Sequence, residues 1–245
     1  MLLENKNAII YGAGGGIGGG VTRTFASEGA KVFLAGRTRP PMEAVAADIR
    51  AAGGSAEVAV LDATDEHAVD AHLEAVAAGA GSVDVSFNLI SRGDVQRRPL
   101  VDMTTDDLLR AVVTGLQSNF LTARAAARQM TRQGSGVILH LNSASGAGAM
   151  PGMGSTGPAD AATESFMRYL AAEVGPQGVR VLGIHTAGVV ETLTREGLDE
   201  VGGEGTPDPG TVERMIAGMA MLRRAPASPR SPTWPRSWPP TGPAA

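Results

Sequence analysis

A glycine-rich segment near the start of the chain has residue types and spacing suited to binding a phosphate group. Residues 11–18 read Tyr-Gly-Ala-Gly-Gly-Gly-Ile-Gly and lie between an apolar run and a helix-like stretch. A glycine turn at that place lets backbone N–H groups and the N-terminus of the following helix approach a pyrophosphate. A flexible loop is the alternative, but the position after a strand and before a helix favours a dinucleotide. The expected contacts are Gly12, Gly14, Gly15, Gly16, Ile17 and Gly18.

The end of the second apolar run bears on which dinucleotide binds. A carboxylate there would hydrogen-bond the 2′-hydroxyl of the adenosine ribose and would repel a 2′-phosphate. The sequence instead reads Ala35-Gly36-Arg37. Gly36 leaves room, and the guanidinium of Arg37 can clamp a phosphate, so we expect NADP(H) to be favoured while NAD(H) stays open. The alternative for Arg37 is a solvated loop position.

Alternating strands and helices must position these segments, and the sequence predicts both. The strand candidates are apolar runs at residues 7–11, 31–35, 56–61, 83–89, 136–142 and 179–185. Helix-forming stretches separate them at residues 17–28, 42–52, 66–78, 106–132 and 161–174. This alternation predicts a doubly wound parallel sheet, the Rossmann α/β fold, with three α/β/α layers and strand order 3-2-1-4-5-6. We expect one domain over residues 1–225, with a mobile substrate segment at about 188–222.

The spacing from Gly12 through Gly16-Ile17-Gly18 resembles the fingerprint of the short-chain dehydrogenase/reductase family, which has threonine where this chain has Tyr11. The resemblance covers residues 5–192 and includes Asp62, Asn88, Asn142-Ser143 and the segment 175–181. It implies a nicotinamide cofactor, with Asp62 at the adenine amino group and Ala63 stacked beside it. Asn88 and Ile90 then belong to the cofactor site as well. An Asx turn after the strand is the alternative for Asp62.

The resemblance also marks catalytic positions. In the family a tyrosine exchanges the alcohol proton, a lysine four residues later lowers the tyrosine pKa, and a serine orients the carbonyl. Ser143 matches the serine, but Thr156 falls at the tyrosine and Asp160 at the lysine. A structural asparagine falls at Gly115, or at Asn119 if the register shifts by one helical turn. Threonine is a poor substitute, because its hydroxyl pKa lies far above the ~10 of a tyrosine.

These substitutions leave several functional hypotheses open. The leading one is an oxidoreductase that moves a hydride between NAD(P)(H) and a small carbonyl or alcohol, with Ser143 polarising the carbonyl. The proton would come from Thr156, His185 or water. A second is a catalytically inactive dinucleotide-binding sensor or regulatory partner. A third is a chain that folds poorly and has no activity.

Three arginines, Arg92, Arg97 and Arg98, lie in the segment that follows the fourth predicted strand. This segment lies over the carboxyl edge of the sheet, where open α/β folds bind ligands, so the arginines could meet an anionic substrate. A solvated loop is the alternative.

Composition excludes several classes of function. The net charge of −4 gives no global attraction to nucleic acid or to anionic lipid, and the absence of cysteine excludes disulfides and thiolate metal sites. No pair of residues has metal-ligand spacing. No run approaches the length of a membrane span, and the first residues lack the apolar core of a signal peptide, so we expect a cytoplasmic protein with a small-molecule substrate.

The last twenty residues, 226–245, hold seven of the 15 prolines and both tryptophans. Proline at that spacing forbids a strand or a helix, so we expect an irregular tail. A sharper hypothesis is that the natural reading frame was lost near Pro226, because GC-rich codons for this stretch spell an amphipathic helix in a neighbouring frame. The resemblance implies a homo-oligomer that uses a final strand, and the altered C-terminus weakens that expectation.

Overall fold

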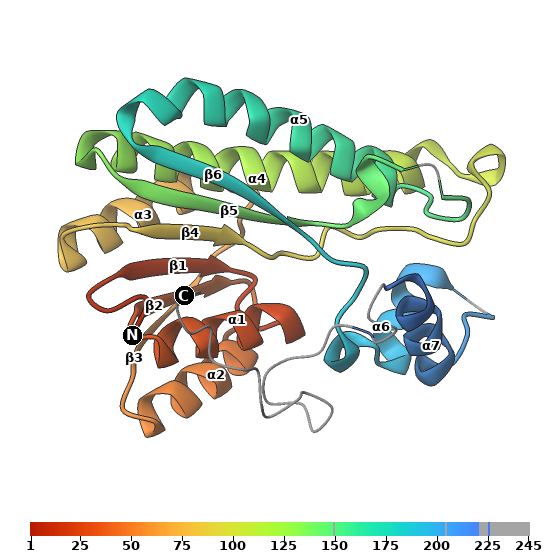
Figure 1. Cartoon of the computed structure of the whole chain (residues 1–245), viewed down its shortest axis with the longest axis horizontal. Helices are drawn as coiled ribbons and strands as arrows, with labels where there is room; N and C mark the ends of the chain where they lie inside the picture. Colours follow the sequence, from red (N-terminus) through yellow and green to blue (C-terminus); the bar gives the residue numbers. More distant parts are fainter. Residues whose placement is uncertain (149, 204, 221–224, 226–245) are drawn as a thin grey trace, which may run out of the picture.

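The computed structural model describes residues 1–148, 150–203, 205–220 and 225. Its centre is a parallel sheet of six strands in the order β3-β2-β1-β4-β5-β6 (Figure 1). The strands are β1 (Asn7–Tyr11), β2 (Lys31–Gly36), β3 (Ser55–Val60), β4 (Val85–Asn88), β5 (Gly136–Asn142) and β6 (Val179–His185). The predicted Rossmann fold, with its strand order, is therefore confirmed.

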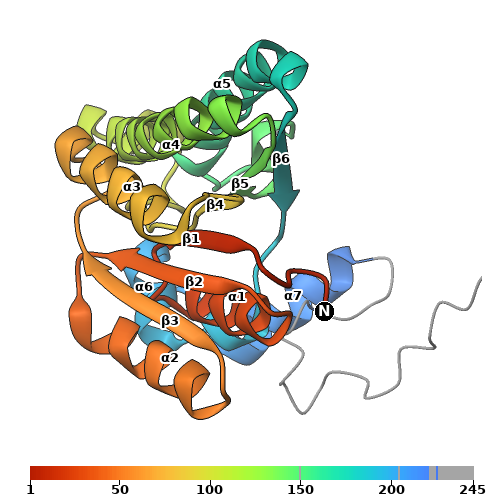
Figure 2. The same ribbon diagram turned by 90° about the vertical axis from the view of Figure 1, so that its left-hand side faces the viewer.

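Two layers of helices cover the sheet. Figure 2 shows α1 (Gly16–Ser27) and α2 (Arg39–Ala51) on one face, and α3 (Glu66–Ala80), α4 (Thr105–Gln133) and α5 (Thr156–Val174) on the other. Successive side chains of a strand point to opposite faces, so each strand serves both cores. On β1, Ile9 and Tyr11 are buried in the core under α3, α4 and α5, while Ala8 and Ile10 are buried in the core under α2.

The bounds of the elements follow the predictions closely, with one difference that matters for the site. Helix α5 begins at Thr156 and not near residue 161. Pro158 lies in the first turn of this helix and not in its interior, where a proline would break it. Its missing N–H costs nothing in a first turn, where no intrahelical partner exists, so the helix can include it. Thr156 and Asp160 consequently lie on one helix, one turn apart.

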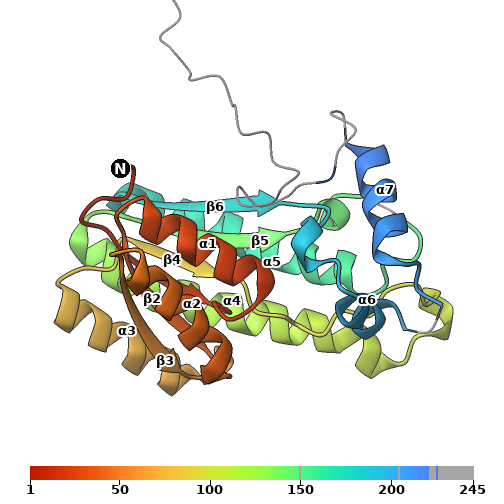
Figure 3. The same cartoon turned by 90° about the horizontal axis from the view of Figure 1, so that it is seen from below.

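The segment expected to be a mobile substrate segment contains two short helices, α6 (Arg195–Gly202) and α7 (Pro209–Met219). Each begins with a side-chain cap, in which Thr194 accepts a hydrogen bond from the Gly197 amide and Asp208 accepts one from the Thr211 amide. Figure 3 shows both helices at the end of the sheet toward which the strand arrows point. Short 3₁₀ turns occur at Leu100–Asp102, Ala144–Gly146, Gly175–Gln177 and Val190–Thr192.

The proline-rich residues 226–245 lie outside the described residues, and with them the expectations of an irregular tail and of a lost reading frame. Within the described part of the chain, no helix is both long and apolar enough to cross a membrane.

Candidate active site

A cavity of about 1640 Å³ lies at the carboxyl ends of the strands. This is the edge at which open α/β sheets bind ligands. The glycine turn, the ends of β2, β4 and β5, and the helices α6 and α7 all contribute to its wall. Most of the residues expected at a cofactor or catalytic position line it, namely Gly12, Gly14, Gly15, Gly16, Ile17, Gly18, Arg37, Asp62, Ala63, Asn88, Ile90, Ser143 and Thr156.

The glycine turn joins β1 to α1 in a conformation that side chains would obstruct. Gly12 has φ +79°, and a Cβ on it would lie 2.5 Å from the backbone oxygen of Leu89. A Cβ on Gly18 would lie 2.1 Å from the oxygen of Gly12. The residue that precedes α1, Gly15, offers no side-chain cap, so the first N–H groups of the helix have no side-chain partner there. This arrangement fits the pyrophosphate of a dinucleotide.

The carboxyl ends of β2 and β3 supply a cation and an anion. Arg37 is exposed, and Asp62 lies at the next strand end. Oδ1 of Asp62 accepts hydrogen bonds from the backbone N of Thr64 at 2.9 Å and from its Oγ1 at 2.7 Å. These bonds, aided by the charge of Arg37, hold the pKa of Asp62 below its usual value. Asp62 is therefore ionised near neutral pH and forms an Asx turn with one of its two oxygens.

Asn88, at the end of β4, is buried and fixes the chain that follows it. Its Oδ1 accepts a hydrogen bond from the backbone N of Ile90 at 3.1 Å, and its Nδ2 donates to Oγ1 of Thr122 at 3.4 Å. These contacts position Ile90 on the cavity wall beside the glycine turn.

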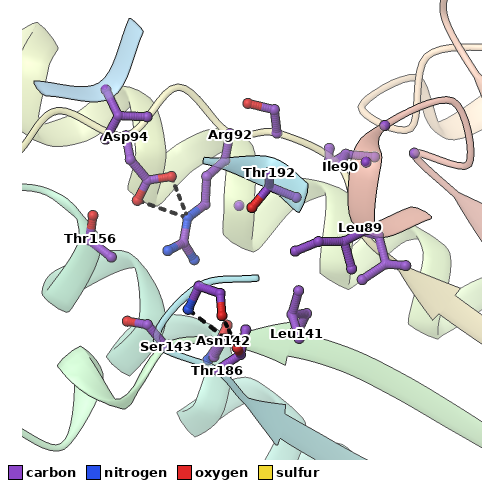
Figure 4. A pocket seen from close by; sticks show the side chains of 18 of the residues that line it. Leu89, Ile90, Arg92, Asp94, Leu141, Asn142, Ser143, Thr156, Thr186 and Thr192 are labelled. Atoms are coloured by element: carbon purple, nitrogen blue, oxygen red, sulfur yellow. Dashed lines mark hydrogen bonds and ion pairs between the residues drawn. The ribbon is translucent and has the colours of Figure 1, made fainter. Parts of the chain in front are cut away.

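A network of charged groups occupies the opposite end of the cavity (Figure 4). Asp160 is fully buried, and its Oδ2 accepts hydrogen bonds from the backbone N of Ser143 at 3.0 Å and from the Ser143 hydroxyl at 2.5 Å. Its Oδ1 lies 2.7 Å from Nη2 of Arg92. Nε of Arg92 in turn donates to Asp94 at 3.0 Å. The buried carboxylate of Asp160 is thus paired with an arginine from the loop after β4.

Gly115, on α4, makes room for that arginine. A Cβ at Gly115 would lie 2.9 Å from Cδ of Arg92, which is closer than carbon atoms normally approach. Burial lowers the pKa of Arg92, but the hydrogen bond to Asp94 and the charge of Asp160 outweigh it and raise the pKa overall. The guanidinium therefore stays charged. Asn119, one helical turn farther along α4, also lines the cavity and donates to the Gly115 oxygen at 2.8 Å.

Thr156 lies beside this network. Its side chain is buried, and its Oγ1 accepts a hydrogen bond from Nε2 of Gln96 at 3.0 Å. Gln96 belongs to the loop after β4, whose backbone also bonds Ser155 and Gly152, so this loop is tied to the start of α5.

The structure does not bring His185 to the cavity. Its Nε2 lies 3.2 Å from Oε1 of Glu164 on α5, and the residues that follow it, Thr186 to Gly188, line the cavity instead. The imidazole at the end of β6 points to the layer of α5 because strand side chains alternate between the faces. The expectation of a proton donor at His185 does not match this geometry. His140 is buried, and that burial lowers its pKa.

The arginines of this loop have partners within the protein, and two of them, Arg92 and Arg97, line the cavity. Arg92 is bound by two carboxylates, and Arg98 pairs with Asp107 on α4. Arg97 donates to the backbone oxygen of Gly205 at 3.0 Å. Sequence analysis identified the loop but missed the pairing of Arg92 with Asp160, because no local spacing indicates it.

The remaining wall of the cavity is apolar and rich in methionine. It comes from the loop before α5 and from α6 and α7, through Met150, Met153, Leu198, Val201, Val212, Met215, Ile216 and Met219. Methionine is unbranched and polarisable, so such a wall adapts to apolar ligands of different shapes.

Comparison with known proteins gives three consistent results. A family model described as enoyl-(acyl carrier protein) reductase matches residues 12–224. The 7alpha-hydroxysteroid dehydrogenase of Escherichia coli strain K12 is 32% identical over 184 residues, which are 75% of this chain and 71% of that protein. The structure of a NAD⁺-bound xylitol dehydrogenase superposes with a TM-score of 0.80 at 25% identity, covering 93% of this chain and 89% of the other.

A metagenomic short-chain oxidoreductase in complex with NADP superposes with a TM-score of 0.69 at 28% identity, covering 77% of this chain and 85% of that one. Solved structures similar to this chain thus hold either of the two nicotinamide dinucleotides.

Proposed function

Because this chain belongs to the short-chain dehydrogenase/reductase family of oxidoreductases, we propose that it transfers a hydride between NADP(H) and a neutral, apolar carbonyl or alcohol. The observation that carries the proposal is the glycine turn at the mouth of the cavity, where a Cβ on Gly12 or Gly18 would clash with backbone. Such a turn leaves the N-terminus of α1 open to a pyrophosphate.

Residues of this chain hold the cofactor in this proposal. The backbone of the glycine turn binds the pyrophosphate, and Asp62 and Ala63 bind the adenine. Asn88 and Ile90 support the ribose that is farther from the adenine. Arg37 binds the 2′-phosphate, which favours NADP(H), while NAD(H) is the weaker alternative. When bound, the nicotinamide gives or takes the hydride.

Features of the other end of the cavity support the proposed substrate class. The methionine-rich wall suits an apolar body, and the charges of Arg92 and Arg98 in the loop after β4 are paired with carboxylates of the protein. Thr156 lines the cavity with a hydroxyl that Gln96 holds in place, and a proton for the product oxygen comes from water or through this hydroxyl.

The test is a titration of NADPH and NADH into the full-length protein, followed by nicotinamide fluorescence. We expect tighter binding of NADPH, and an Arg37→Gln variant should weaken NADPH by about tenfold, as expected for a hydrogen bond to a charged group, with little change for NADH. Arg39→Gln is the matched control, because Arg39 pairs with Glu43 at 3.0 Å and does not line the cavity.

Failure of both dinucleotides to bind would refute the proposal. Tight binding with no turnover of any carbonyl or alcohol would favour the sensor hypothesis, which Thr156 and Asp160 at the positions expected for the tyrosine and lysine motivate.

A further inference from the structure

The hydroxyl of Ser143 has only one proton, and the structure commits it to a neighbour inside the protein. The proton is donated to Oδ2 of Asp160 at 2.5 Å, while the oxygen accepts the backbone N–H of Ser145 at 3.1 Å. A hydroxyl is a single donor, so it cannot also donate to a carbonyl in the cavity. The oxygen of a substrate carbonyl therefore needs another donor at this end of the cavity.

Arg92 is the cation placed to supply it. Figure 4 shows its guanidinium on the same side of the cavity as Ser143 and Thr156, and its side chain is only 14% exposed. The pairs with Asp94 and Asp160 use Nε and Nη2, which leaves the N–H bonds of Nη1. Both carboxylates hold the guanidinium in one orientation, and a guanidinium does not lose its proton at physiological pH.

Two residues on neighbouring helices fix the place that Arg92 takes. Gly115 on α4 has no side chain, and Cδ of Arg92 passes where a Cβ would stand. Asp160 on α5 supplies a buried carboxylate, at 0% exposure, that would be unpaired without the arginine. A buried charge without a partner is costly, so these three residues are interdependent.

We propose that Arg92 binds the carbonyl oxygen of the substrate through Nη1, and that Ser143 and Asp160 are positioning residues that hold it there. This rests on the proposed function. In the reductive direction the hydride adds to the carbonyl carbon, and the electron pair of the C=O π bond moves to the oxygen that Arg92 binds. That oxygen then takes a proton from water, and Arg92 keeps its own.

The same network predicts which substrates are rejected. Two carboxylates face one guanidinium, so the cluster of Asp94, Arg92 and Asp160 carries one net negative charge. A carboxylate on the substrate would be repelled by this net negative charge, whereas a neutral carbonyl would not. The site therefore selects neutral carbonyl compounds over acids.

Binding of two unreactive probes to the full-length protein tests this without relying on turnover. Octanamide presents a neutral carbonyl and octanoate a carboxylate, on the same apolar chain. We expect the wild type to bind octanamide at least tenfold more tightly than octanoate, and Arg92→Met to weaken octanamide at least tenfold. Arg98→Met, a surface arginine on the same loop, should stay within twofold of the wild type.

The double variant Arg92→Met with Asp160→Asn separates binding from a merely structural role. It removes both buried charges, so it keeps the fold if Arg92→Met alone does not. A structural role predicts that the double variant regains the affinity for octanamide, and this result would overturn the proposal. We expect the affinity to stay low, and Arg92→Lys to restore part of it.

Running the titrations with and without NADPH keeps this inference distinct from the proposed function. Octanamide binding that depends on Arg92, in a protein that binds no dinucleotide, would refute the proposed function and support the inference. Carbonyl reduction that survives in Arg92→Met with an unchanged KM would refute the inference alone.

Discussion

Contacts within the glycine turn and at Asp62, at the proposed dinucleotide end of the cavity, join residues that are close in sequence, whereas the contacts that hold Thr156 and Asp160 at the proposed substrate end join residues that are far apart. Gly12 and Gly18 shape one turn, and Asp62 bonds Thr64, two positions on. At the other end Gln96 holds Thr156 across 60 residues, and Arg92 meets Asp160 across a similar distance. Local sites leave a motif in the sequence. A site whose residues come together only in the folded chain leaves no such local motif.

The largest effect on stability should come from breaking the ion pair between Arg92 and Asp160. Arg92→Met leaves Asp160 buried without its cation, and we expect the free energy of unfolding to fall by about 3–5 kcal/mol. Denaturant unfolding of the single and double variants with Asp160→Asn measures this. The double variant should recover more than half of the loss, and two additive effects would contradict the pairing.

Substitution in the glycine turn should lower stability by a slightly smaller amount. Gly18→Ala places a Cβ 2.1 Å from the Gly12 oxygen, so the turn must open. We expect a loss of about 1–3 kcal/mol in stability and a loss of dinucleotide binding, both measured on the purified variant. Gly20→Ala is the control on the same helix, because a Cβ there meets nothing within 4 Å. It should raise stability slightly, and equal damage from both variants would show that the turn is not the cause.

A smaller effect on stability is expected at Gly115 on α4, which leaves room for Arg92. Gly115→Ala places a Cβ 2.9 Å from Cδ of a side chain and not from backbone, so the arginine can shift partly away. We expect a cost of about 1 kcal/mol, together with weaker octanamide binding at unchanged dinucleotide affinity. Thermal unfolding and the two titrations measure these quantities. Weaker dinucleotide binding with intact octanamide binding would reverse the assignment of the two ends.

The smallest effect concerns pH. Burial lowers the pKa of His140 from its usual 6.5, so the folded protein binds fewer protons than the unfolded chain below that pH. Stability should therefore fall as the pH drops from 6.5 toward the lower pKa of the folded state. Denaturant unfolding of wild type and of His140→Gln, which stays neutral, compares the slopes. A slope that is the same in both proteins would exclude His140 as its source.

Much of this molecule could be predicted from its sequence. The apolar runs predicted the strands, and β1, β5 and β6 have the predicted bounds, because each run is too short and too apolar to form a solvent-exposed helix. The order of the strands was expected from the doubly wound fold and is confirmed. The glycine turn could be predicted because only glycine fits the close backbone approach there, so the residue type itself marks the turn in the sequence.

The rest depended on contacts between distant parts of the chain. In the sequence, Arg92 is one of three arginines in a loop, and Asp160 is a carboxylate where the family resemblance implies a lysine. Only the fold shows that the two form one ion pair and that Gly115 leaves the space for it. His185 read as a candidate acid because it ends a strand, but its orientation toward Glu164 depends on which face of β6 it occupies.

The most direct test of the account is the consumption of NADPH by the full-length protein in the presence of a neutral apolar ketone such as 2-octanone, followed by nicotinamide absorbance. We predict turnover that is faster with NADPH than with NADH and that falls at least tenfold in Arg92→Met but not in Arg98→Met. Tight binding of NADPH without consumption, for this ketone and for a broad panel of other carbonyls, would contradict the account.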